Sequence, residues 1–150
     1  MSGQPLFLSP EAPRTDLHVV GEIIHVLADG SQTSGPEVFE QRGPEGSGPP
    51  PHTHPWDEAY FMLDGSMDVV LGDRTVVLTR GAFVYIPAGT VHCFRYRVGG
   101  GRFLSFNSRA GAAKFFRELD RVLPDGSVDL GKIVPIAVAN QVVPAGPPPG

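Results

Sequence analysis

G-S-G-P-P-P-H-T-H-P-W-D-E-A-Y-F-M-L-D-G, residues 46–65, is the stretch on which both the fold and the site depend. His52 and His54 are separated by one residue, and Glu58 follows four residues after the second histidine. Residues i and i+2 of an extended chain share a face, so the two imidazoles can point the same way. A local turn through Pro55 would return the carboxyl group of Glu58 to that side. Two imidazoles and a carboxylate are a ligand set that suits Fe, Mn, Ni, Co or Zn.

Length and composition narrow the class of protein. The 150 residues favour one domain with one core, and the 19 glycines and 16 prolines suit an all-β chain with many tight turns. The formal net charge is −4 and no basic block is visible, so we expect no nucleic-acid partner. The apolar runs are too short for a transmembrane helix, so no membrane partner is expected. Without the charged-then-apolar plan of a signal peptide, the expected location is cytoplasmic.

Short runs of β-branched and aromatic residues, separated by turn residues, predict strands between residues 17 and 107. Asp64-Gly65 is expected to form a hairpin turn between strands at 57–63 and 66–71. The three consecutive glycines at 99–101 are expected to form a flexible turn before the last strand. This plan predicts a β-sandwich or a small β-barrel.

The spacing of apolar residues changes after residue 107. Residues 110–123 carry them along one stripe, which predicts a helix with Ser108 as its N-cap. Residues 128–143 are apolar but ambiguous, because Pro135 would interrupt a helix there. The expected organisation is an N-terminal arm (1–16), a barrel (17–107), a C-terminal helical segment (108–143) and a flexible tail (144–150).

Two stretches of this chain resemble the two motifs of the cupin superfamily. The spacing of the first motif is met by Gly46, His52, His54, Glu58 and Gly65. The spacing of the second motif is met by Gly81, Pro87, Gly89 and His92, while Tyr96 replaces its closing asparagine. The resemblance implies an all-β fold, the cupin double-stranded β-helix (a jelly-roll barrel), with a C-terminal α-helix.

The resemblance also implies a metal site. One divalent transition metal (Fe, Ni, Mn, Co, Cu or Zn) would be held inside the barrel by His52, His54, Glu58 and His92. Three neutral imidazoles and one carboxylate leave two positions of an octahedron for water, substrate or dioxygen. The alternative is a barrel that keeps the motif without a functional metal.

Strand parity extends the site into a predicted substrate pocket. Tyr60 and Met62 share the face of Glu58 if this strand is extended. A hydroxyl group beside a metal can act as acid, base or orienter, so Glu58 and Tyr60 are the catalytic candidates. A mainly apolar pocket with a few polar groups suits a small aromatic ligand. The candidate lining residues are Phe39, Gln41, Tyr60, Met62, Phe94, Tyr96 and His25, and the alternative for each is a side chain that only fills the barrel or the core.

More narrowly, the chain is similar to small bacterial cupins of the quercetin dioxygenase-like type. The similarity lies in T-S-G-P-E-V-F-E (33–40), H-T-H-P-W-D-E-A-Y-F-M-L-D-G (52–65) and A-K-F-F-R-E-L (113–119). Cupins that cyclise aromatic polyketides share much of this pattern, and DMSP lyases share the Glu-x-Tyr pair, here Glu58 and Tyr60.

Three functions follow from these resemblances. The first is a metal-dependent oxygenase that acts on a hydroxylated aromatic or polyketide-like small molecule. The second is a non-redox, metal-assisted cyclase, isomerase or lyase. The third is a small-metabolite binding cupin without turnover. A homodimer is also expected, because cupins of this size are often dimers and an edge strand within residues 19–26 would need covering.

Overall fold

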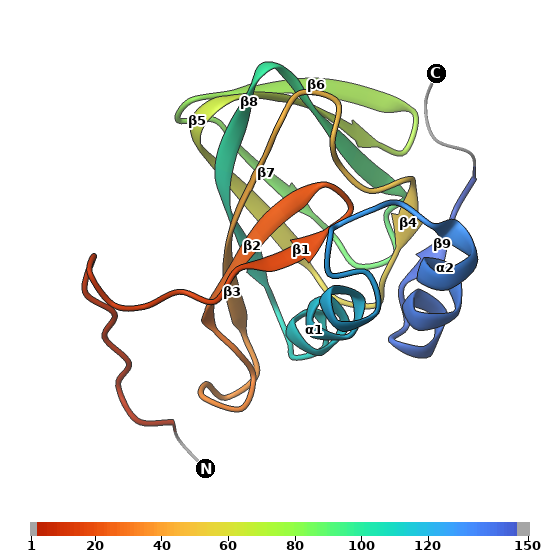
Figure 1. Ribbon diagram of the computed structural model, residues 1–150. Helices are drawn as coiled ribbons and strands as arrows, with labels where there is room; N and C mark the ends of the chain where they lie inside the picture. The colour runs from red at the N-terminus through yellow and green to blue at the C-terminus, as the bar shows by residue number, and fades with distance from the viewer. Residues whose placement is uncertain (1–2, 147–150) are drawn as a thin grey trace.

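The computed structural model describes residues 3–146, and its strands curl into a half-open barrel with two helices at one end (Figure 1). The elements in chain order are β1 (Leu17–Val19), β2 (Glu22–Ala28), β3 (Glu37–Gly43), β4 (His52–Thr53), β5 (Glu58–Leu71), β6 (Arg74–Thr79), β7 (Phe83–Ile86), β8 (His92–Asn107), α1 (Ala112–Val122), α2 (Leu130–Ala139) and β9 (Val143–Pro144). The predicted all-β jelly-roll with a C-terminal helix is confirmed, and a second helix is added to it.

All the strands belong to one sheet, and two long strands organise it. The hydrogen-bonded order β1-β2-β3-β8-β4-β9 forms one path, and β5 pairs with β6, β7 and β8. Strands β5 and β8 run antiparallel beside each other along most of their length. Their register shifts between Met62 and Asp64 and again between Gly65 and Met67. Such irregularities bend and twist a strand pair, which lets the sheet curl into a barrel.

The hairpin turn expected at Asp64-Gly65 is wrong, and so is the turn expected at residues 99–101. Strand β5 continues through the first site, and β8 continues through the second. Gly65 lies opposite Gly101 and has a φ of 69°. A Cβ atom at Gly65 would collide with the carbonyl oxygen of Gly100. These glycines therefore allow the close approach of two strands at a bulge, which a local sequence pattern cannot distinguish from a turn.

Helix α1 is capped from a distant strand. The backbone N–H groups of Gly111 and Ala113 donate to the carboxyl group of Glu37 on β3, at 2.5 and 2.9 Å. The prediction of Ser108 as the N-cap is wrong, because its Oγ accepts the backbone N–H of Asp57 at 2.9 Å instead. Glu37 satisfies donors that the start of a helix otherwise leaves free, and it fixes α1 against the sheet.

Helix α2 settles the ambiguity of residues 128–143. It contains Pro135 in its interior and begins after the N-cap Asp129. Ile133 and Ala137 lie on its buried face, so packing against the rest of the protein offsets the hydrogen bond that proline removes. Within residues 3–146, no helix combines the length and the apolar character that crossing a membrane requires.

The end of the described chain is paired rather than free. Thr53 lies opposite Val143 in the β4–β9 ladder, and the N–H of Ala145 donates to the carbonyl oxygen of Pro51 at 2.9 Å. The tail expected from residue 144 therefore begins as part of the sheet. Residues 147–150 of that tail, and residues 1–2 of the expected arm, lie outside the described residues.

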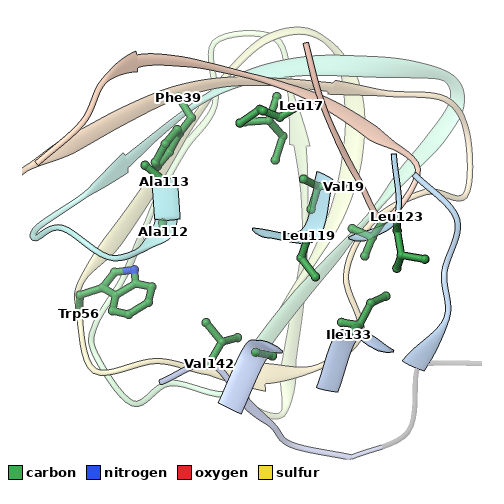
Figure 2. Close-up of a cluster of buried hydrophobic side chains, with 13 residues drawn as sticks. Leu17, Val19, Phe39, Trp56, Ala112, Ala113, Leu119, Leu123, Ile133 and Val142 are labelled. Carbon is green, nitrogen blue, oxygen red and sulfur yellow. The ribbon is translucent and has the colours of Figure 1, made fainter. Parts of the chain in front are cut away.

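Buried apolar side chains form two clusters. The first joins β1, β2 and β3 to the helices, and Figure 2 shows Val19 beside Leu119 and Phe39 beside Ala113. The second cluster fills the barrel and consists of Tyr60, Met62, Met67, Val69, Leu78, Ile86, Phe94, Tyr96 and Phe103. The helices thus close one end of the barrel, while side chains fill the other.

Candidate metal centre and adjoining cavity

Three histidines meet inside the barrel, at the end where the helices lie. The ligand atoms of His52, His54 and His92 all lie within 4.8 Å of one another. Strand β4 begins at His52 and β8 begins at His92, and these two residues are paired partners in the sheet. The antiparallel ladder therefore sets the third histidine against the first two, although 38 residues of chain separate His92 from His54.

Each imidazole is oriented by a backbone carbonyl group. The Nδ1 atom of His52 lies 2.9 Å from the oxygen of Pro50, that of His54 lies 3.0 Å from the oxygen of Trp56, and that of His92 lies 2.8 Å from the oxygen of Thr90. A carbonyl oxygen only accepts, so all three Nδ1 atoms carry the hydrogen. The neutral rings then turn a lone pair on Nε2 toward the common centre, as metal-ligating histidines do.

Glu58 completes the cluster in a way that requires positive charge. Its Oε2 atom lies 2.7 Å from Nε2 of His54 and 3.1 Å from Nε2 of His92. If both rings are neutral and carry their hydrogen on Nδ1, the Nε2 atoms of His54 and His92 are acceptors, and both face Oε2 of Glu58, which is also an acceptor. Either additional protons or a metal ion at the centre removes this conflict. The donor set of three imidazole nitrogens and one carboxylate therefore fits a divalent transition metal.

The protonation states also suit a metal site. Burial, together with the neighbouring His92, lowers the pKa of His52 to about 3, so His52 is neutral near pH 7. Burial opposes ionisation of Glu58, but hydrogen bonds from the protonated forms of His54 and His92 outweigh it and lower the pKa of Glu58 below its ordinary value. A neutral imidazole and an ionised carboxylate are the forms that bind a metal.

A chain of hydrogen bonds holds the other oxygen of Glu58. Ser105 donates to Oε1 of Glu58 at 3.2 Å, and Asn107 donates to the hydroxyl oxygen of Ser105 at 3.1 Å. The indole N–H of Trp56 donates to the side-chain oxygen of Asn107 at 2.8 Å. Ser105 and Asn107 were not among the site residues predicted from the sequence. Their signal was present, because two polar residues alternate on one face of a strand whose other residues are mostly apolar.

A cavity of about 220 Å³ adjoins the cluster, and His52, Glu58 and Tyr60 form part of its wall. Helices α1 and α2 contribute apolar side chains, among them Phe115, Leu119 and Ile133. The lining residues come from both apolar clusters, so the cavity lies between the barrel interior and the helical cover. A small apolar ligand would fit there, with one edge at the histidines.

The predicted pocket residues divide into two groups. Gln41, Tyr60 and Phe94 line the cavity. The others are buried elsewhere or face outward: Phe39 packs edge-on against Phe116 at 5.1 Å between centroids, Met62 and Tyr96 lie in the barrel core, and His25 pairs with Asp16.

The prediction that His25 reaches the pocket is wrong. Its Nε2 atom lies 2.6 Å from the carboxyl group of Asp16, which is exposed. Alternation along β2 explains the error, because Glu22 and Ile24 are buried and His25 has the opposite parity. The inward residue of this strand, not predicted from the sequence, is Glu22, which is buried and lines the cavity.

Comparisons with known proteins agree with this geometry. Residues 39–104 match the family described as Cupin domain. The chain is 28% identical over 99 residues to quercetin 2,3-dioxygenase of Bacillus subtilis, and the aligned region covers 63% of this chain and 29% of that protein. An RmlC-like cupin from Shewanella frigidimarina superposes with a TM-score of 0.64 at 18% identity, over 73% of this chain and 96% of that chain. The polyketide cyclase RemF from Streptomyces resistomycificus superposes with a TM-score of 0.54 at 28% identity, over 61% of this chain and 68% of that chain.

The described residues have the fold of cupins, and the chain matches the Cupin domain family over residues 39–104. It spans less than half the length of the curated relatives that it matches. Cupins commonly bind a metal, and the histidine cluster of His52, His54 and His92 could hold one ion here.

Proposed function

We propose that this cupin is a metal-dependent enzyme that acts as an oxygenase on a hydroxylated aromatic or polyketide-like small molecule. The observation that carries the proposal is the opening of the histidine cluster onto an apolar cavity, with His52, Glu58 and Tyr60 in the wall. The similarity to a quercetin 2,3-dioxygenase supports the choice of substrate class.

His52, His54, Glu58 and His92 would hold the metal. When bound, a divalent transition metal would supply redox chemistry or Lewis acidity to a coordinated oxygen of the substrate. Two of its ligands, His54 and Glu58, are already restrained: Trp56 stacks on the imidazole, and Ser105 donates to the carboxylate. A restrained ligand set needs little rearrangement when a metal binds.

Tyr60 has a role that follows from its position between the cluster and the cavity. Burial raises the pKa of Tyr60 well above its ordinary value, and the negative charge of Glu58 raises it further. The hydroxyl group therefore keeps its proton throughout the ordinary pH range. It can donate a hydrogen bond to a substrate oxygen, orient the ring, or transfer a proton in the reaction.

The helical cover would exclude water from the reacting groups. Phe115 and Leu119 of α1 and Ile133 of α2 line the cavity on the side opposite the sheet. An apolar wall strengthens hydrogen bonds to the substrate and protects reactive species from water. The cover also favours a flat aromatic ligand over a charged sugar.

A second candidate function is a metal-assisted polyketide cyclase. It is favoured by the similarity to RemF, which matches this chain at 28% identity over 68% of the RemF chain. In that reaction Glu58 and Tyr60 would move protons without a redox step. The same residues serve both candidates, so the reaction has to be decided by experiment.

Oxygen dependence separates the two candidates. Protein purified without an affinity tag is analysed for metal content and then incubated with quercetin in an oxygen electrode. Oxygen uptake that requires the bound metal supports the oxygenase. Equal conversion of a polyketide-like phenol with and without oxygen supports the cyclase. A metal-loaded protein that converts neither compound contradicts both and leaves a binding cupin.

A further inference from the structure

We propose that Glu22, held by Tyr96 and Gln41, is a second recognition site in the cavity and binds an oxygen at the far end of an aromatic ligand. The ligand class is a hydroxylated aromatic with oxygens at both ends, one at the histidine cluster and one at Glu22. The inference deepens the proposed function and rests on it for the class of ligand.

Glu22 is a built polar site inside apolar surroundings. It begins β2, is 2% exposed and lines the cavity. The hydroxyl group of Tyr96 donates to its Oε1 atom at 2.7 Å. The side-chain amide of Gln41, from the neighbouring strand β3, donates to the same carboxyl group at 3.3 and 3.4 Å. A buried carboxyl group with this support has a fixed position and little freedom to turn away.

The Glu22 site and the histidine cluster are separated along the barrel. His92, Phe94 and Tyr96 alternate along β8 and are all buried, so they share its inner face. Four residues of a strand span about 13 Å, which places Tyr96 that far along β8 from His92. The ring of Phe94 lies between them, and its centroid is 5.7 Å from the centroids of both Tyr60 and Tyr96.

The carboxyl group of Glu22 is suited to donate a hydrogen bond. Burial raises the pKa of Glu22 to about 8, against the lowering effects of Tyr96 and Gln41, so the neutral acid predominates near pH 7. Both of these partners donate to the carboxyl group. The acid's own proton is therefore left for an acceptor outside that pair. A carbonyl or phenol oxygen of a ligand in the cavity would supply the acceptor.

The surroundings select the rest of the ligand. Tyr60 and Phe94 offer aromatic faces between the two polar sites, and the helices add aliphatic side chains. A planar aromatic ligand would bury its rings there and present one oxygen to each end. An apolar ligand without the distant oxygen would leave the buried donor of Glu22 unpaired, which costs affinity.

The test compares two flavonols that differ in their distant oxygens. Quercetin carries hydroxyl groups far from its chelating hydroxyl–carbonyl pair, whereas 3-hydroxyflavone keeps only that pair. Binding to the full, metal-loaded chain is measured by calorimetry without oxygen. We expect the wild type to prefer quercetin by about tenfold, the effect of one buried hydrogen bond.

Two substitutions of Glu22 separate its chemistry from its volume. Glu22→Met fills similar space without a donor, so it should abolish the preference for quercetin while leaving metal content unchanged. Glu22→Gln is the matched control, because its amide still donates, and its preference should stay within about threefold of the wild type. Tyr96→Phe removes a hydrogen bond to the carboxyl group and should weaken the preference in part. This variant tests the role of Glu22 even if Glu22→Met does not fold.

The outcomes are distinct. A preference that survives in both Glu22→Met and Tyr96→Phe overturns the inference while the proposed function stands. A preference that disappears in Glu22→Gln as well overturns the role of Glu22 as a neutral donor. Failure of both flavonols to bind the metal-loaded wild type contradicts the ligand class of the proposed function, and the inference fails with it.

Discussion

The imidazole ring of His54 and the indole ring of Trp56 lie stacked, with centroids 4.3 Å apart and planes inclined by only 7°. The same indole donates to Asn107, which connects through Ser105 to Glu58. One tryptophan therefore restrains two candidate metal ligands, one by stacking and the other through hydrogen bonds. This relationship makes Trp56 and its partners a support of the site rather than an anchor of the loop alone.

Replacing Asn107 with alanine should weaken this support. The substitution leaves the indole N–H of Trp56 and the hydroxyl group of Ser105 without their partner, which should lower the free energy of unfolding by about 1–3 kcal/mol. Metal affinity should fall by about 10- to 100-fold. Chemical denaturation and competition with a chelator measure the two effects. Asn140→Ala, in a hydrogen-bonded site at the end of α2, is the control and should affect stability alone. Equal metal affinity in both variants would contradict the role of Asn107.

The double variant His52→Ala/His54→Ala should fold and lose its metal. Two of the four donors are removed, so bound metal per chain should fall by at least about tenfold. Elemental analysis measures the metal, and circular dichroism measures the fold. His25→Ala is the matched control, because His25 pairs with Asp16 outside the cavity. Wild-type metal content in the double variant would contradict the assignment of His52 and His54 as metal ligands.

The variant Tyr60→Phe should keep the metal and lose turnover. The phenyl ring still fills the barrel, but it cannot donate or transfer a proton, so kcat should fall by about 100-fold. Steady-state kinetics with the substrate found by the oxygen-uptake screen measures the change. Tyr85→Phe is the control, because its hydroxyl group donates to exposed Asp57. If Tyr60→Phe and Tyr85→Phe both turn over at the wild-type rate, Tyr60 is a packing residue.

Glu22 should make stability depend on pH. Its pKa is raised from 4.5 to about 8 on folding, so the folded state binds the proton more tightly than the unfolded state. This contribution to stability is complete below pH 4.5 and is lost as the pH rises toward 8. The side chain of Glu22→Gln does not titrate, so the variant should not lose this stability as the pH rises. Its free energy of unfolding, relative to that of the wild type, should therefore increase by on the order of 3 kcal/mol between pH 5 and pH 8.

Urea denaturation at several pH values measures the effect of Glu22→Gln. Glu45→Gln, at an exposed site in the loop after β3, is the control and should follow the wild-type curve. Parallel pH profiles for Glu22→Gln and the wild type would show that the carboxyl group is not protonated in the folded state near pH 7.

The outer face of the sheet offers a surface for the expected homodimer. Phe83 and Tyr85 of β7 are 61% and 54% exposed. Phe61 lies opposite Phe83, and Phe106 lies opposite Ala59, which is also the partner of Tyr85. We propose that a second copy of this chain covers this face, because a two-fold contact brings an apolar patch against itself.

The variant Phe83→Asp should then shift the protein from dimer to monomer, measured by light scattering after size exclusion. Val98→Asp changes another exposed apolar residue, at the bend of β8, and should leave the mass unchanged. A monomeric wild type, or a Phe83→Asp variant that remains dimeric, would contradict this surface.

Residues close together in the sequence, and the local pattern of apolar and turn residues, were sufficient to predict the class of fold and the centre of the site. His52, His54 and Glu58 lie within seven residues, and one extended segment with a turn brings them together. The paired motif spacing added His92. Alternating apolar residues and many turn residues predicted the strands, although Gly65 and the glycines at 99–101 proved to be bulges inside long strands.

The tertiary structure alone decided which residues surround that centre. Ser105 reaches Glu58 across 47 residues of sequence, and Tyr96 reaches Glu22 across 74. Such contacts depend on which strands pair and in what register, and a one-residue slip would turn each side chain to the other face. The ligand cluster is therefore a local property of the sequence, whereas its support, its cavity and the second carboxyl group are products of folding.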